Sequence, residues 1–110
     1  NGRLKKMIRF FFYNKANSEQ DIDLSSFDIN AICYDISVYE YQNLSFYELV
    51  PVIYNQMKKI ATDENKADNL VSVDGREYIF RGNSTKKNNL KKLLAEVEGI
   101  FIDLKSILRL

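Results

Sequence analysis

The 110-residue sequence contains no histidine, one cysteine and one proline. Without histidine it cannot form a Ser-His-Asp or Cys-His nucleophilic site, use a histidine general base or bind a metal through imidazole. The single Cys33 cannot form an internal disulfide and lacks partners for a zinc site, which fits a reducing compartment. No apolar run approaches the roughly 18 residues that span a bilayer, and the first residues lack a signal-peptide pattern. We therefore expect a cytoplasmic protein with no membrane partner.

The chain also lacks an excess of one charge, because its 16 lysines and arginines nearly balance its 15 aspartates and glutamates and leave a net charge of +1. Any electrostatic recognition must therefore be local. Hydrophobic residues make up 45% of the chain and aromatic residues 13%, which is enough for one folded core. We expect residues 1–110 to form a single domain. Because the chain starts at Asn1 rather than at a methionine, we also expect it to belong to something longer.

Apolar residues at helical spacing predict a first amphipathic helix of about three turns. Its apolar positions are Leu4, Met7, Ile8 and Phe11, and its basic residues fall largely on other faces. The aromatic run 10–13 is also compatible with a buried strand, because short apolar runs do not separate the two periods. We favour the helix, followed by a polar loop over 14–23.

A second helix is predicted by Ser25 and Asp28, which form an acidic variant of the capping box. The box predicts that the helix starts near Ser26. The alternation of apolar residues over 27–33 also fits a strand, and the cap favours the helix. We expect Cys33 to be a buried small hydrophobe. The face expected to be buried comprises Phe27, Ala31, Tyr34 and Val38.

The third helix has the clearest signal, since Ser45 and Glu48 form a complete S-x-x-E capping box. Pro51 lies early in this helix, where it should kink the helix or delay its start. The stripe expected to be buried comprises Phe46, Leu49, Val50, Ile53, Met57 and Ile60.

Beyond a polar run over 62–69, Asp74-Gly75 lies between two β-prone segments and predicts a hairpin. A polar connector follows, and from Leu90 apolar residues continue at helical spacing through Leu108. The predicted fold is mainly α with a small β-hairpin. It is a compact helical bundle in the order helix, helix, helix, hairpin, helix.

Asp21 and Asp23 form a D-x-D pair, which polymerase-like nucleotidyltransferases use to hold two Mg²⁺ ions against a triphosphate. The Gly-Ser turn that precedes the pair in such enzymes is missing, since only NKANSEQ stands before it. A complete minimal enzyme built on Asp21, Asp23 and Asp28 would place all its carboxylates on one short stretch. We therefore interpret the pair as acidic residues near a helix N-terminus, where the helix dipole favours them.

The order of the predicted helices and loops is more informative than the D-x-D pair. A basic helix with LKKMIRFFFYNK is followed by a short polar loop and by a helix that opens with Ser25-Ser26-Phe27. This arrangement resembles the helical C-terminal lobe of the nucleotidyltransferase superfamily that includes cyclic GMP-AMP synthase, oligoadenylate synthase and their bacterial relatives. The segment LVSVDGREYIF and the terminal helix also fit that lobe.

The resemblance implies that Ser26 and a cation of the first helix hold the triphosphate tail of a nucleoside triphosphate. Phe27, in place of the usual tyrosine, would stack on the base, which contributes roughly 1 to 3 kcal/mol. Lys5, Arg9 and Lys15 are the candidates for the cation. The resemblance also implies that Mg²⁺ is held by an N-terminal catalytic lobe, and that this chain binds no metal and is inactive alone.

The same residues also have structural interpretations. Ser26 could cap its helix, Phe27 could belong to the core, and the lysines of the first helix could form a solvated face. The chain would then be a non-enzymatic helical module that binds nucleic acid or a protein partner. The pairs Lys86-Lys87 and Lys91-Lys92 could contact nucleic-acid phosphates or serve only as solubilising charges.

Overall fold

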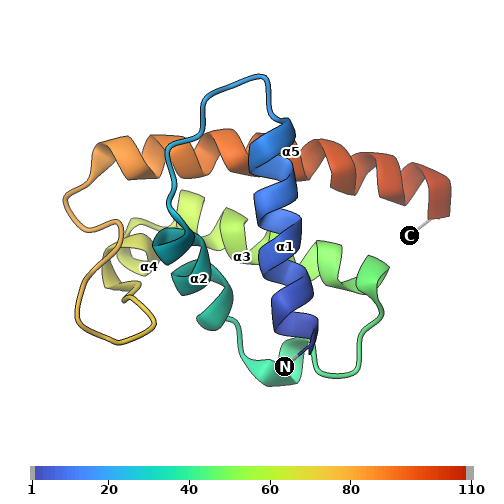
Figure 1. Ribbon diagram of the computed structural model, residues 1–110, viewed down its shortest axis with the longest axis horizontal. Helices are drawn as coiled ribbons and strands as arrows, with labels where there is room; N and C mark the ends of the chain where they lie inside the picture. Colours follow the sequence, from blue (N-terminus) through green and yellow to red (C-terminus); the bar gives the residue numbers. More distant parts are fainter. Residues whose placement is uncertain (1, 109–110) are drawn as a thin grey trace.

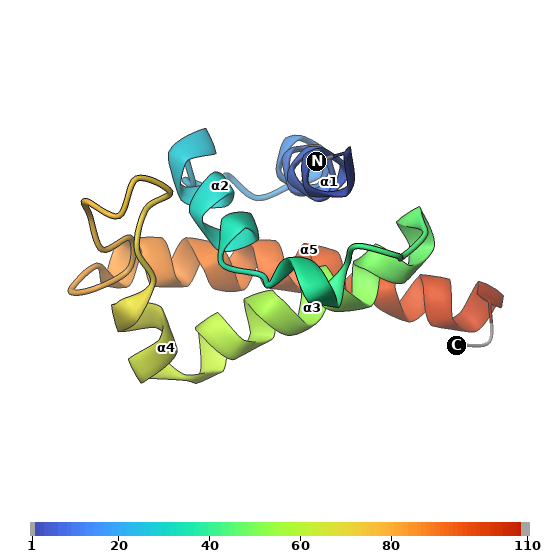
Figure 2. The same ribbon diagram turned by 90° about the horizontal axis from the view of Figure 1, so that it is seen from below.

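The computed structural model describes residues 2–108 (Figure 1). The elements are α1 (Gly2–Asn17), α2 (Ser26–Tyr34), the 3₁₀ helix η1 (Val38–Glu40), α3 (Phe46–Thr62), α4 (Glu64–Asn69) and α5 (Ser84–Leu108). Helix α5 runs along the longest dimension, and α1 crosses it. Seen from below, α1 and α2 lie on one side of α5, and α4 with most of α3 lies on the other (Figure 2).

The core lies where α1, α2 and α3 meet the first half of α5. Helix α3 packs along α5, and α1 contacts α2, α3 and α5. The predicted stripe of α3 is buried except for Phe46, which is 44% exposed. Helix α3 begins at Phe46, so Pro51 does not delay its start. The largest fully buried side chains are Met7, Phe11, Leu24, Ile29, Ile32, Leu49, Ile53, Met57, Ile60, Phe80, Leu90 and Leu93.

The aromatic run of α1 is helical, as predicted, and the helix is longer than the predicted three turns or so. Each residue turns the helix by about 100°, so consecutive aromatic rings point in different directions. Phe11 is fully buried, Phe12 is 36% exposed and Tyr13 is 63% exposed. The ring of Phe11 therefore belongs to the core, whereas that of Tyr13 belongs to the surface.

The face of α2 predicted to be buried is wrong except at Ala31, which is 1% exposed. Phe27 and Tyr34, two turns apart on one side of the helix, are 41% and 55% exposed, and Val38 lies beyond the helix end. The helix is short and packs against both α1 and α3, so its smaller apolar residues occupy the inside. Cys33 is fully buried, as predicted. The buried residues of α2 are Asp28, Ile29, Ala31, Ile32 and Cys33.

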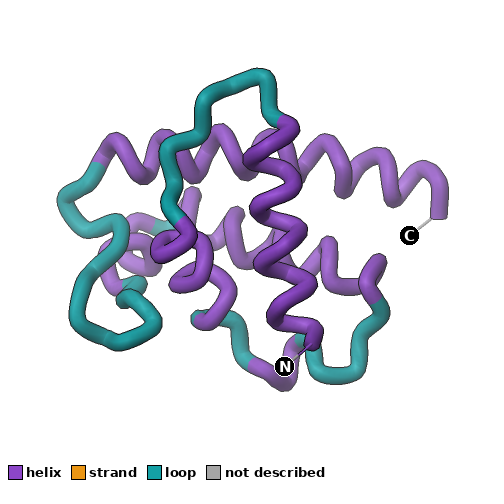
Figure 3. The backbone as a smooth tube through the Cα atoms, viewed as in Figure 1, coloured by secondary structure: helices purple, strands orange, loops and turns teal. Residues whose placement is uncertain are grey.

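The predicted hairpin is present only as a turn and one isolated antiparallel bridge, between Val71 and Tyr78. Gly75 adopts a φ of 73°, the left-handed conformation that such a turn requires. No strand occurs among residues 2–108 (Figure 3). The hydroxyl of Ser72 accepts the amides of Arg76 and Glu77, at 3.2 and 3.1 Å, so a side chain takes the place of longer strand pairing.

The polar run over 62–69, for which no helix was predicted, contains α4. The side chain of Asp63 caps this helix by accepting the amides of Asn65 and Lys66, at 3.1 and 3.2 Å. Lys87 of α5 pairs with Glu64 and Asp68 at 2.8 and 2.9 Å. Along the described part of the chain, no helix has both the length and the apolar character to cross a membrane.

Candidate functional site

The N-terminus of α2 is formed by the predicted capping box. Ser25 Oγ accepts the amide of Asp28 at 3.2 Å, and the carboxylate of Asp28 accepts the amide of Ser25 at 3.0 Å. The helix begins at Ser26, as predicted. Because Ser25 makes the cap, the interpretation of Ser26 as the capping residue is wrong, and its hydroxyl is not used to hold the helix end.

Ser26 and Phe27 are both exposed at this end of the helix. Within residues 2–108, the amides of these two residues donate to no acceptor. The exposure of Phe27, at 41%, argues against its interpretation as a core side chain. Free helix N-terminal amides bind anions, and an exposed aromatic face can stack on a planar base. The two chemistries lie on adjacent residues.

Of the three candidate cations, the structure brings Lys15 to this end of α2. Lys15 Nζ donates a hydrogen bond of 2.6 Å to the carbonyl oxygen of Leu24, the residue before the cap. Lys5 and Arg9 lie about 15 Å and about 9 Å back along the axis of α1. Arg9 instead lines a groove of about 530 Å³ together with Lys6, Phe10, Tyr13, Phe46 and Ile100.

The charge of Asp28 is neutralised by Lys86, which no sequence pattern had connected with it. Its side chain is 2% exposed, and its Oδ1 lies 2.8 Å from Nζ of Lys86 on α5. A buried carboxylate is costly unless it is paired and hydrogen-bonded, and Asp28 is both. Lys86 and Lys87 thus make ion pairs within the fold, which weakens their interpretation as a nucleic-acid contact.

The segment that precedes α2 is fastened along one face of α5 (Figure 1). The side chain of Asn89, which is 6% exposed, accepts the amide of Asp23 at 2.7 Å and donates to the carbonyl of Thr85 at 2.8 Å. Ser18 Oγ donates to Glu96 Oε1 at 2.8 Å. We call Lys86, Asn89, Lys92 and Glu96 the α5 tether, with Lys92 donating to the carbonyl of Asp21 at 3.4 Å.

The acidic residues near α2 do not fit a pair of Mg²⁺ ions. Asp21 and Asp23 are exposed, whereas Asp28 is buried and bonded to Ser25 and Lys86. Residues 2–108 contain no group of three or more cysteine, aspartate or glutamate side chains placed to hold a metal.

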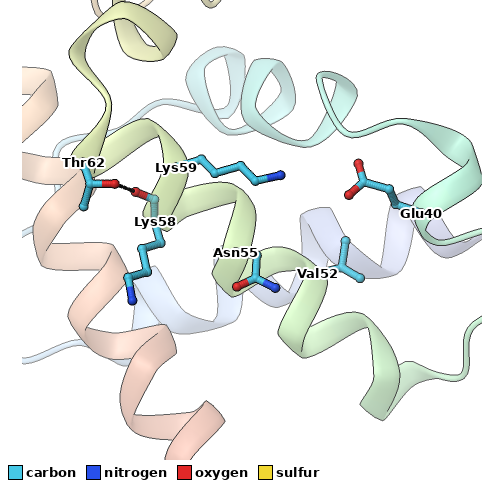
Figure 4. Close-up of a pocket in the computed structure, with 6 residues that line it drawn as sticks. All are labelled: Glu40, Val52, Asn55, Lys58, Lys59 and Thr62. Atoms are coloured by element: carbon cyan, nitrogen blue, oxygen red, sulfur yellow. Dashed lines mark hydrogen bonds between the residues drawn. The ribbon is translucent and has the colours of Figure 1, made fainter.

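A second hollow of about 480 Å³ lies between η1 and α3 (Figure 4). Lys59 extends toward Glu40, and Lys58 points away from it. Thr62 Oγ1 donates to the carbonyl of Lys58 at 2.7 Å, so its hydroxyl is taken up by the helix backbone. None of the residues expected to bind a nucleotide lines this hollow.

Comparisons with known proteins bear out the resemblance drawn from Ser25-Ser26-Phe27. The profile of the cGAS/DncV-like nucleotidyltransferase C-terminal helical domain matches residues 1–101. A c-di-GMP synthase of Capnocytophaga granulosa is 53% identical over 108 residues, which are 97% of this chain and 31% of that protein. A c-di-GMP synthase of a Lachnospiraceae bacterium is 47% identical over 104 residues, which are 94% of this chain and 30% of that protein.

Solved structures agree with the sequence match. The STING-associated CdnE c-di-GMP synthase from Capnocytophaga granulosa superposes with a TM-score of 0.93 at 52% identity, over 96% of this chain and 35% of that chain. The corresponding synthase from Flavobacteriaceae sp. gives a TM-score of 0.84 at 38% identity, over 92% of this chain and 30% of that chain. This chain spans about a third of the length of these relatives. It belongs to the cGAS/DncV-like nucleotidyltransferases, as the C-terminal helical domain of that family.

Proposed function

We propose that this chain is the helical lobe of a bacterial c-di-GMP synthase, and that the N-terminus of α2 positions a GTP in its cleft. The observation that carries the proposal is the adjacency of an exposed serine, an exposed aromatic ring and a lysine at one helix start. Ser26 and Phe27 open α2, and Lys15 is bonded to Leu24 just before it. The relatives named above are c-di-GMP synthases, and this product indicates GTP as the nucleotide.

The triphosphate tail is held by Lys15 together with the hydroxyl and amide of Ser26. A lysine ammonium carries three donors, and Leu24 uses one of them, so two remain for phosphate oxygens. The amides of Ser26 and Phe27 add the positive end of the helix dipole. Phe27 stacks on the guanine and, lacking the tyrosine hydroxyl, contributes only the face of its ring.

The role of the lobe is positioning rather than bond making. A correctly oriented triphosphate turns a bimolecular step into an effectively unimolecular one, which is a large part of catalysis in phosphoryl transfer. The proposal assigns the catalytic carboxylates and their Mg²⁺ to an N-terminal catalytic lobe of the same protein. Alone, the helical lobe is expected to bind GTP weakly and to form no product.

The direct test is Ser26→Ala in the full-length protein, with Ser106→Ala on the exposed distal part of α5 as the matched control. Loss of a hydrogen bond to a charged phosphate costs about 1.5 to 3 kcal/mol, so KM for GTP should rise by tenfold or more. The control should leave KM unchanged. If steady-state kinetics gave the same KM for both variants, Ser26 would not contact the nucleotide.

A further inference from the structure

We propose that Lys86 is a positioning residue that keeps the N-terminus of α2 able to accept the triphosphate, by neutralising Asp28 beneath it. The inference rests on the proposed function, because it concerns the same helix end. Lys86 is not expected to touch the nucleotide. It acts through the carboxylate of Asp28, to which it is bonded at 2.8 Å.

The capping box creates an electrostatic conflict at this helix end. It places the carboxylate of Asp28 in the first turn of α2, next to the amides of Ser26 and Phe27 that are free for an anion. Asp28 cannot move away, since one of its oxygens accepts the amide of Ser25 at 3.0 Å. Its side chain is 2% exposed, so water screens its charge poorly. Without a counter-ion, Asp28 would repel a triphosphate.

Lys86 removes this conflict because its ammonium is fixed in place. The backbone amide of Lys86 donates to Asn83 Oδ1 at 3.0 Å, which anchors the first turn of α5. The side chain of Lys86 is 32% exposed, and its Nζ bonds the second oxygen of Asp28. Both oxygens of the buried carboxylate are thus occupied, one by Ser25 and one by Lys86. The pair is neutral, so the ammonium of Lys15 remains as a cation at this helix end.

The test compares charge variants in the full-length protein by steady-state kinetics with GTP. Lys86→Met should raise KM by about tenfold, because it leaves a buried negative charge near the phosphates, and kcat should change less. Lys86→Arg keeps the positive charge and should therefore leave KM near the wild-type value. Lys91→Met, which removes an exposed lysine of the same helix, is the matched control and should leave KM unchanged.

Asp28→Asn separates electrostatics from folding. Asparagine keeps an acceptor for Ser25 and leaves Lys86 without its counter-ion, so KM should fall below the wild-type value. Because Lys86 is one-third exposed, its ammonium can turn to water, and this variant should fold even if Lys86→Met does not. The double variant Lys86→Met with Asp28→Asn should return KM to near the wild-type value. A purely structural role for Lys86 would not give opposite shifts for the two single variants.

Several outcomes would overturn the inference. Equal KM values for Lys86→Met and Lys91→Met would show that the charge of Lys86 does not matter for the nucleotide. A rise in KM for Asp28→Asn would show that the box matters through its shape rather than its charge. These results would leave the proposed function intact if Ser26→Ala still raised KM. If Ser26→Ala had no effect, the proposed function itself would fail.

Discussion

Lys15 Nζ lies 2.6 Å from the carbonyl oxygen of Leu24, which ties the last turn of α1 to the residue just before the cap of α2. The sequence offered three cations for the same role, and this contact places one of them, Lys15, beside the N-terminus of α2. Leu24 is itself fully buried, so the carbonyl that receives the lysine is held by the core.

We therefore expect Lys15→Met to raise KM for GTP by about tenfold or more, because it removes a charge-assisted contact to phosphate. Lys5→Met and Arg9→Met remove the same charge about 15 Å and about 9 Å further along α1 and serve as matched controls. They should change KM by less than about twofold. A larger rise in KM for Arg9→Met than for Lys15→Met would indicate that the phosphate contact lies in the groove that Arg9 lines.

Phe27→Ala should weaken nucleotide binding by about 1 to 3 kcal/mol, the usual contribution of a base stacked on an aromatic ring. Tyr34→Ala is the control, because Tyr34 is exposed on the same side of α2, two turns away. Phe27→Tyr should bind at least as well as the natural residue, since it keeps the ring. Binding by full-length protein can be followed by calorimetry, and equal losses from both alanine variants would contradict stacking on Phe27.

The neighbouring rings of Phe11 and Phe12 should differ sharply in their contribution to stability. Phe11 is fully buried, and Phe11→Ala should cost about 3 to 5 kcal/mol of the free energy of unfolding. Phe12 is 36% exposed, and Phe12→Ala should cost about 1 kcal/mol or less. Urea unfolding of the two variants checks this difference, and similar midpoints would mean that α1 faces the core differently.

The cap of α3 should respond to acid. The amide and hydroxyl of Ser45 donate to Glu48 Oε1 at 3.0 and 2.8 Å, and they hold the pKa of this carboxyl below its ordinary value. A lowered pKa means that the stabilisation is complete above the ordinary glutamate pKa of about 4.3 and is lost as the pH falls through the lowered value. Glu48→Gln should therefore melt below the wild type at neutral pH and approach it in acid. Glu19→Gln, at an exposed loop position, should show no such convergence.

Local signals in the sequence predicted much of this fold correctly. Both capping boxes lie where Ser25 and Ser45 indicated, because a cap depends on side chains only three residues apart. The apolar stripe of α3 was predicted because a long helix with one buried face has a clear period. Helix α4 was missed because it has six residues and no apolar stripe, and it is held by Asp63 and Lys87.

The candidate site was only half predictable, and the reason is distance along the chain. Ser26, Phe27 and Lys15 belong to one local segment whose pattern could be matched to a family. Lys86 and Asn89 meet that segment from positions 58 and 66 residues away from their partners. In the sequence, Lys86 belongs to a run of lysines in a polar stretch, and nothing local indicates a buried carboxylate as its partner.

The α5 tether also sets the order in which the lobe can be completed during synthesis. Its contacts join residues that are 58 to 78 positions apart, so the segment before α2 leaves the ribosome well ahead of its partners. At roughly 5 to 20 residues per second, that delay lasts several seconds. During this interval Asp28 lacks Lys86, and the segment before α2 lacks its anchors. The proposed nucleotide site at the N-terminus of α2 is therefore complete only after α5 has emerged.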